Sequence, residues 1–161
     1  MGKNFARKAI CMILAMSLVL SAAAVAFAAS SPVKPKSNVV EKHYTTYTVN
    51  DKNQTATLIK AKANKKVYTF DGTIMHSGKT YTMVKIAGKA FAKVKKLKTI
   101  KITDKKSFTV DKNAFQGLSK AQLKKVVVKV TKKMSKKEFK KLKKQFQKAG
   151  IKSKNIKRVK M

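Results

Sequence analysis

Residues 72–80 are the stretch of this sequence that comes nearest to a ligand-binding motif. They read G-x-x-x-x-x-G-K-T, close to the phosphate-binding loop in which backbone N–H groups and a lysine hold a nucleotide. That loop needs four residues between its glycines and a helix directly after it. Here five residues separate the glycines, and residues 81–84 (YTMV) alternate like a strand. We therefore interpret residues 77–78 (Ser-Gly) as a hairpin turn.

The other reactive side chains are scattered along the chain. His43 and His76 lie far apart and Cys11 is the single cysteine, whereas a metal site needs such residues clustered. No serine sits in the glycine-flanked turn of a nucleophile. No spacing pairs the acids for general acid–base catalysis, which are Glu41, Asp51, Asp71, Asp104, Asp111 and Glu138. The sequence thus predicts no metal site, no cofactor and no enzymatic activity.

Positive charge is the dominant chemistry of the chain. Lys and Arg number 40 against 6 Asp and Glu, for a formal net charge of +34. After residue 28 the only arginine is Arg158. Lysine is a hydrated point charge, whereas the arginine fork reads phosphates and bases bidentately. We therefore expect weakly selective attraction to polyanions and no specific nucleic-acid recognition. The alternative is that the charge only keeps the protein soluble.

The first 28 residues have the order of an export signal. Three cations, Lys3, Arg7 and Lys8, precede the uncharged stretch 10–28, which ends in A-F-A. The polar S-S-P at 30–32 favours cleavage over the alternative, an uncleaved membrane anchor of about 19 apolar residues. We expect a secreted protein, which charge could retain on the cell wall. After cleavage it keeps about +31, no cysteine and no transmembrane segment.

Short strands are predicted after a flexible linker at residues 29–43, which is rich in Ser, Lys and Pro. Runs rich in Thr, Tyr and Val indicate strands, and they fall at 44–49, 55–59, 67–70, 73–76 and 79–86. Turn residues between these runs suggest that the strands follow one another in antiparallel order. We expect residues 44–85 to form an N-terminal β cap.

Residues 86–130 contain two copies of one pattern. I-A-G-K-A-F at 86–91 returns as V-D-K-N-A-F at 110–115, an offset of 24 residues. Such a period is typical of leucine-rich repeats, whose units stack to bury a continuous core. We expect Phe91 and Phe115 to be equivalent core residues. After two inserted residues, Leu97, Ile100 and Ile102 map onto Leu123, Val126 and Val128.

Residues 131–161 predict a C-terminal cap with an amphipathic helix at 135–149. S-K-K-E at 135–138 indicates a capping box, and Met134 and Phe139 a hydrophobic staple. One helical face is apolar, the other is nearly all lysine, and Gly150 is placed to end the helix. A strand at 156–159 follows. The helix could lie on an anionic membrane, but its capping signals favour a docked cap. The candidate anionic-ligand surface is Lys132, Lys133, Lys136, Lys137, Lys140 and Lys143.

Residues 81–102, 110–120 and the lysine-rich 129–150 together resemble the BspA-like leucine-rich-repeat proteins of bacterial cell surfaces. The I-x-x-x-A-F signature followed by L-x-x-I-x-I is the most specific part, and the resemblance covers residues 44–161. It implies an α+β, mostly β fold: antiparallel hairpins leading into a solenoid of about two repeats, capped by the C-terminal helix. It also implies export and a role in binding or adhesion. This chain has two clear repeats where larger members have more.

Two functions fit these features. The first is a non-enzymatic secreted or cell-surface binding module for anionic cell-wall polymers, matrix or host proteins. The second is a cationic extracellular effector acting on membranes or nucleic acid. A folded β-rich circular dichroism spectrum in plain buffer favours the first, and a coil that becomes helical only on anionic vesicles favours the second.

The exported protein is expected to begin at or near Ala29, because the small residues before it form the cleavage site. N-terminal sequencing of protein recovered from culture medium measures this directly. Recovery of an exported chain that retains residues 5–13 contradicts the expectation.

Overall fold

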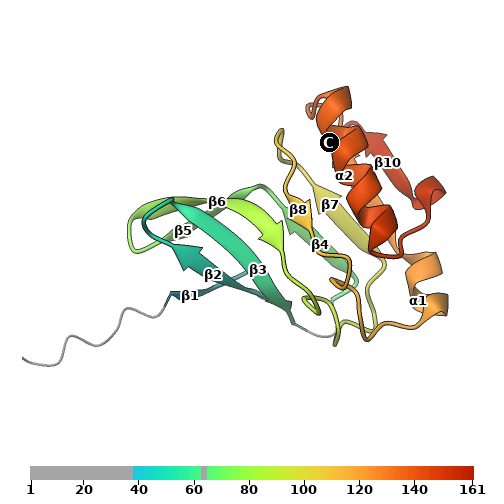
Figure 1. The fold of residues 1–161 in the computed structure, drawn as a ribbon, viewed down its shortest axis with the longest axis horizontal. Coiled ribbons are helices and arrows are strands. Elements are labelled where there is room, and N and C mark those ends of the chain that lie inside the picture. The colour runs from blue at the N-terminus through green and yellow to red at the C-terminus, as the bar shows by residue number, and fades with distance from the viewer. Residues whose placement is uncertain (1–37, 63–64) are drawn as a thin grey trace, which may run out of the picture. The chain divides into compact units, whose positions relative to one another are not determined.

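The strands of the described residues form two β-sheets (Figure 1). The structure is a computed structural model that describes residues 38–62 and 65–161. The predicted α+β, mostly β class is confirmed. The export signal and residues 29–37 of the linker lie outside the described residues.

Sheet A has the order β1-β2-β3-β6-β5, with β8 beside β6. Its strands are β1 (Val39–Lys42), β2 (Thr45–Asn50), β3 (Thr55–Ala61), β5 (Thr73–His76), β6 (Lys79–Ile86) and β8 (Thr109–Val110). The hairpins β1–β2, β2–β3 and β5–β6 are antiparallel, whereas β3, β6 and β8 pair in parallel. Leu58, Ile86 and Val110 are matched across these parallel strands, and all three are buried.

Sheet B is parallel throughout, in the order β10-β9-β7-β4. Its strands are β4 (Val67–Phe70), β7 (Thr99–Ile102), β9 (Val127–Thr131) and β10 (Ile156–Val159). Tyr68, Ile100, Val128 and Ile156 occupy matched positions and are buried. Because side chains alternate along a strand, the residues between them point to the opposite face of sheet B.

The expected antiparallel succession of strands is wrong at β4, which leaves its sequence neighbours and pairs with β7 in sheet B. The chain changes sheets at Gly72, whose φ of +84° lies in the left-handed region. A Cβ at Gly72 would lie 1.9 Å from Oδ2 of Asp104, so a larger residue would displace the Asp104 side chain and strain the backbone at this φ. Residues 71–72 therefore form a crossing between sheets rather than a hairpin.

The predicted linker ends too late, because β1 occupies Val39–Lys42 and pairs with β2. Within this strand the side chain of Val40 is buried in the core.

The predicted alignment of the repeat strands is also wrong by two residues. Ile100 pairs with Val128 and Ile102 with Val130, rather than with Val126 and Val128. The second unit contains a short helix, α1 (Lys120–Lys125). Ser119 and Gln122 form a full capping box at its N-terminus. This helix adds length before the strand and carries Leu123, which is partly buried.

A column of aromatic rings runs from β4 to the C-terminal helix. The rings of Phe91 and Phe115 stack with centroids 5.0 Å apart, and Phe146 continues the column at 6.2 Å from Phe115. Tyr68 and Phe70 of β4 meet Phe91 edge to face. All five side chains are buried, so the column fills the centre of the core.

The C-terminal helix, α2 (Lys136–Lys148), packs against β8 and β10 (Figure 1). Ser135 accepts a hydrogen bond from the Glu138 N–H. The predicted capping box is only half formed, because the Glu138 carboxylate accepts from Ser107 instead. At the other end Gly150 has a φ of +95°, and the Ile151 N–H donates to the Phe146 carbonyl, as in a Schellman cap. A 3-10 turn (Ser153–Asn155) leads into β10.

Truncating either stacked ring, as Phe91→Ala or Phe115→Ala, should lower the free energy of unfolding by about 3–5 kcal/mol. The cost combines lost apolar burial with a cavity in the centre of the core. Met75→Ala is the control, because Met75 is 74% exposed and should change stability little. Chemical denaturation measures all three variants. Wild-type stability of both phenylalanine variants contradicts the central role of the column.

Candidate functional site

Three of the six predicted lysines come together on the outer side of α2. Lys137, Lys140 and Lys143 line a shallow hollow of about 560 Å³, together with Lys141 and Lys144. The last two follow the same helical face but were missing from the sequence prediction. The other three predicted residues are exposed but do not line the hollow: Lys132, Lys133 and Lys136. We call this hollow the α2 lysine surface.

No carboxylate lines the α2 lysine surface. Glu138 is the one acid in α2, and its carboxylate accepts from the hydroxyl and N–H of Ser107. These two hydrogen bonds lower the pKa of Glu138, and Lys141 and Lys137 contribute further. Like charges three or four residues apart repel on a helix, so an anion bound here would relieve that repulsion.

The apolar side of α2 packs into the core. Leu142 and Phe146 are fully buried, and Ala149 and Ile151 are nearly so. The Gln145 side chain accepts from the Val110 N–H at 2.5 Å, closing the free edge of β8. Only the lysine face therefore remains available to a ligand. No helix among the described residues has the length and apolar character needed to cross a bilayer.

A second group of lysines surrounds a hollow of about 750 Å³ where the strands of sheet B begin. These lysines come from three separate segments of the chain: Lys66, Lys95, Lys96, Lys98 and Lys125. Leu97, Thr99 and Val127 also line this hollow. Sequence reasoning missed it, because no local pattern shows which loops meet at one end of a parallel sheet.

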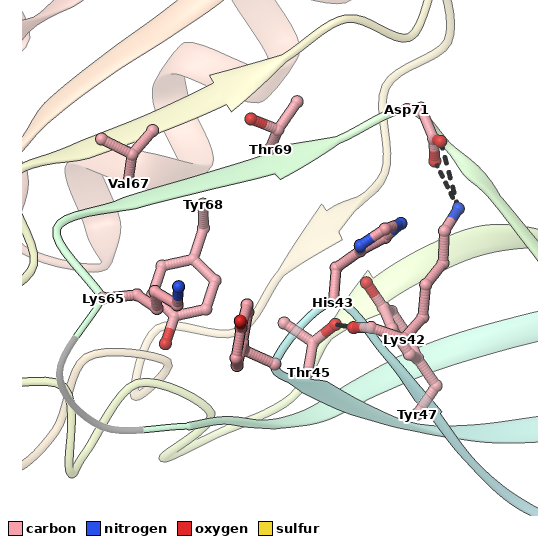
Figure 2. Close-up of a pocket in the computed structure, with 10 residues that line it drawn as sticks. Lys42, His43, Thr45, Tyr47, Lys65, Val67, Tyr68, Thr69 and Asp71 are labelled. Carbon is pink, nitrogen blue, oxygen red and sulfur yellow. Dashed lines mark hydrogen bonds and ion pairs between the residues drawn. The ribbon is translucent and has the colours of Figure 1, made fainter.

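A pocket of about 350 Å³ lies between the β1–β2 hairpin and β4 (Figure 2). His43 and Tyr44 form the hairpin turn with φ values of 44° and 68°. This two-residue turn favours Asn-Gly, because side chains with a Cβ are strained at positive φ. Tyr44 is 55% exposed, and the Lys65 Nζ lies 3.7 Å from its ring centroid, in range of a cation–π contact.

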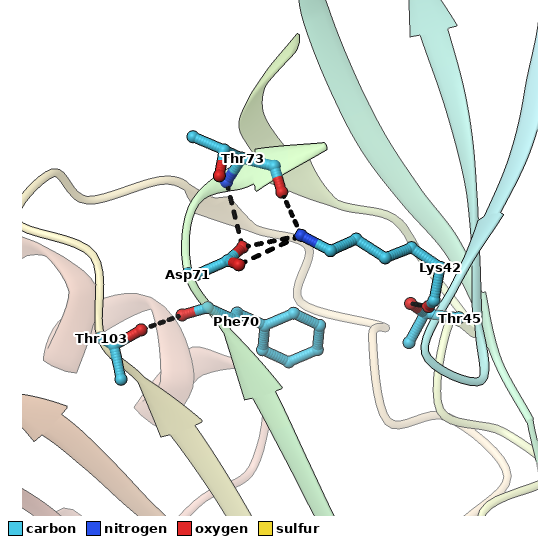
Figure 3. A network of polar contacts seen from close by, with 6 residues as sticks. All are labelled: Lys42, Thr45, Phe70, Asp71, Thr73 and Thr103. Carbon is cyan, nitrogen blue, oxygen red and sulfur yellow. Dashed lines mark hydrogen bonds and ion pairs between the residues drawn. The ribbon is translucent and has the colours of Figure 1, made fainter. Parts of the chain in front are cut away.

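Asp71, whose carboxylate lines this pocket, forms an ion pair with Lys42. The Lys42 Nζ lies 3.1 Å from Oδ2 of Asp71 and donates to the Thr73 carbonyl at 2.6 Å (Figure 3). Asp71 also accepts from the Thr73 N–H at 3.2 Å. These contacts hold the hairpin of sheet A against the crossing to sheet B. Asp71 therefore orders the backbone around the pocket.

The structure also shows where the glycine-containing turn at residues 77–78 and the two histidines lie. Residues 77–78 form the turn between β5 and β6, and no helix follows them, so the hairpin interpretation is confirmed. His43 lies in a turn and His76 ends β5. Across residues 38–62 and 65–161, no three His, Cys, Asp or Glu side chains cluster closely enough for a metal ion.

Comparison with known proteins gives one distant likeness. No protein-family model matches the chain, and no curated protein matches it. Among solved structures it is similar to a leucine-rich cell surface protein from Faecalibacterium prausnitzii A2-165, with 18% sequence identity and a TM-score of 0.35. The alignment covers 58% of this chain and 32% of that one, so this chain spans about a third of that protein's length. A likeness this distant assigns neither fold nor function.

Strain in the hairpin turn makes a testable prediction. Tyr44→Gly should be more stable than Tyr44→Ala by about 1 kcal/mol, because only glycine adopts a φ of 68° without penalty. Both variants lose the ring and its contact with Lys65, so the comparison isolates the backbone. Thermal and chemical denaturation measure the difference. An alanine variant as stable as the glycine variant contradicts the strained turn.

Proposed function

We propose that this chain is a secreted, non-enzymatic binding module of the BspA-like leucine-rich-repeat type. In this proposal residues 44–161, extended at the front by β1, form one short solenoid. Its partners are anionic polymers outside the cell, those of the cell wall first, with matrix and host proteins of similar charge as further ligands. Two features support the repeat assignment: the recurring A-F signature and the parallel strands of matched register.

The observation that carries the binding proposal is the α2 lysine surface. Five lysines line one hollow, and none of them takes part in the salt bridges Lys42–Asp71, Lys62–Glu41 and Lys79–Asp51. A single exposed ion pair contributes only about 0–1 kcal/mol. A polymer that repeats its charge engages several lysines in one binding event, so the weak contacts add.

The burial of Leu142 and Phe146 favours polymer binding over action on membranes. An interfacial helix inserts its apolar face into lipid. In this chain that face would first have to leave the aromatic column and expose the β8 edge. The lysine face can meet a polymer with the helix docked.

Binding to purified cell wall should weaken sharply between 0.1 M and 1 M salt, because the screening length falls from about 10 Å to about 3 Å. Changing the α2 lysine surface to glutamine at residues 137, 140, 141, 143 and 144 should weaken binding at low salt by about tenfold or more, the loss of a few weak ion pairs. A sedimentation assay with the full chain measures both effects.

The matched control changes five exposed lysines elsewhere and removes the same charge: Lys52, Lys60, Lys85, Lys105 and Lys112. We expect a smaller loss in this variant, since its lysines are dispersed. Equal losses in the two variants would show that net charge alone drives binding. An affinity for cell wall that changes neither with salt nor with either set of substitutions contradicts the proposal.

A further inference from the structure

The outward face of sheet B carries a row of lysines that only the strand register reveals. Lys101 of β7 pairs with Lys129 of β9, and Lys129 pairs with Lys157 of β10. The neighbours of Lys101 along the strand, Ile100 and Ile102, are buried on the other face. The three lysines therefore stand side by side on the outer face. We call them the lysine row.

This arrangement is unfavourable in the free protein. Neighbouring strands lie about 4.8 Å apart, and like charges directly opposite each other destabilise a sheet. The other exposed or half-buried outward positions of the four strands hold Val and Thr side chains, with no carboxylate to neutralise the row: Val67, Thr69, Thr99, Val127 and Val159. A bound anion would remove the repulsion.

A second group of lysines lies at the start of the same strands, around the 750 Å³ hollow to which Lys66, Lys98 and Lys125 contribute. Between the lysine row and this group lies a strip of uncharged residues, in which Val67 pairs with Thr99 and Thr99 with Val127. The strip is two residues from the lysine row, about 6.7 Å along the strand. We use the name sheet B channel for the lysine row, the strip and this second group of lysines together.

The backbone under the sheet B channel is held by hydrogen bonds. The N–H groups of Lys98 and Thr99 donate to the Lys66 carbonyl at 2.8 and 2.9 Å, and the Val127 N–H donates to the Lys98 carbonyl at 2.8 Å. The Gln122 amide donates to the Lys95 carbonyl at 2.9 Å. The lysine stems thus leave from fixed positions, which limits the ordering cost of binding to the side chains.

We infer that the sheet B channel binds one extended polyanion, laid across the strands between the lysine row and the lysines of the 750 Å³ hollow. The inference rests on the proposed function and names its ligand: a linear polyol-phosphate polymer. Phosphate oxygens accept charge-assisted hydrogen bonds from ammonium groups. The acyclic linkers between phosphates lie over the valines and threonine of the strip.

Single-stranded nucleic acid has the same charge but fits this channel less well. Proteins that bind it provide aromatic side chains on which the bases stack. No aromatic residue lines the hollow or occupies an outward position of the four strands. The lysines also lack the fork geometry that reads bases.

The test measures the affinity of the full chain for poly(glycerol phosphate) over a series of salt concentrations. The sheet variant is Lys101→Gln, Lys129→Gln and Lys157→Gln. With about 0.7 counterions released per phosphate contact on a flexible polyanion, three lost contacts should reduce the slope of log K against log salt by about 2. The charge-keeping variant, Lys→Arg at the same positions, should keep the wild-type slope.

Two matched triples remove the same charge elsewhere. One changes Lys137, Lys140 and Lys144 on the α2 lysine surface, and the other changes Lys52, Lys85 and Lys112. A slope that falls most in the sheet variant supports the inference, with circular dichroism confirming that every variant is folded. Equal slopes in the sheet variant and the dispersed control overturn it.

The remaining outcomes separate this inference from the proposed function. A slope that falls only in the α2 variant leaves the proposed function standing and overturns the sheet B channel. No binding by the wild-type chain at low salt, to this polymer or to cell wall, overturns both. Tighter channel-dependent binding of a single-stranded oligonucleotide or a sulfated glycan of equal charge density overturns the choice of ligand.

Discussion

The stacking of Phe91 on Phe115 is the contact on which the rest of the structure depends. The two rings are buried and stack with their centroids 5.0 Å apart. Tyr68 and Phe70 attach β4 to one end of the column, and Phe146 attaches α2 to the other. Cys11 is the single cysteine, so no disulfide within the chain stabilises the fold. The stability must come from packing of this kind.

The sequence predicts what depends on local pattern. Alternation located most strands of both sheets after residue 44 but not β8, and the pattern repeated after 24 residues identified Phe91 and Phe115 as equivalent. Features set by distant parts of the chain were missed. The partner of β4 lies 32 residues away in β7, and the Glu138 carboxylate finds Ser107, 31 residues away, in place of the expected cap. A local motif cannot show that a competing donor exists.

The same division applies to the candidate sites. Helical spacing found three of the lysines that line the hollow on α2, Lys137, Lys140 and Lys143, since residues on one helical face are fixed by their separation in sequence. Lys101, Lys129 and Lys157 form a row only because each unit places its strand at the same register. The two-residue error in the predicted register would have paired Lys101 with Val127. An error of two residues in the predicted loop length is therefore enough to miss the alignment of these three lysines.

Stacking also explains how a repetitive core leads to a repetitive surface. Each unit that adds an inward Ile or Val to the core also adds an outward residue to the neighbouring position on the other face. A lysine at that position on one strand is a single surface charge, but on three neighbouring strands it becomes a line with the spacing of the strands. The repulsion along this line opposes folding, and the apolar residues beneath it offset that cost. Burial of the aromatic column and its flanking aliphatic rows is therefore what keeps these lysines together in the absence of a ligand.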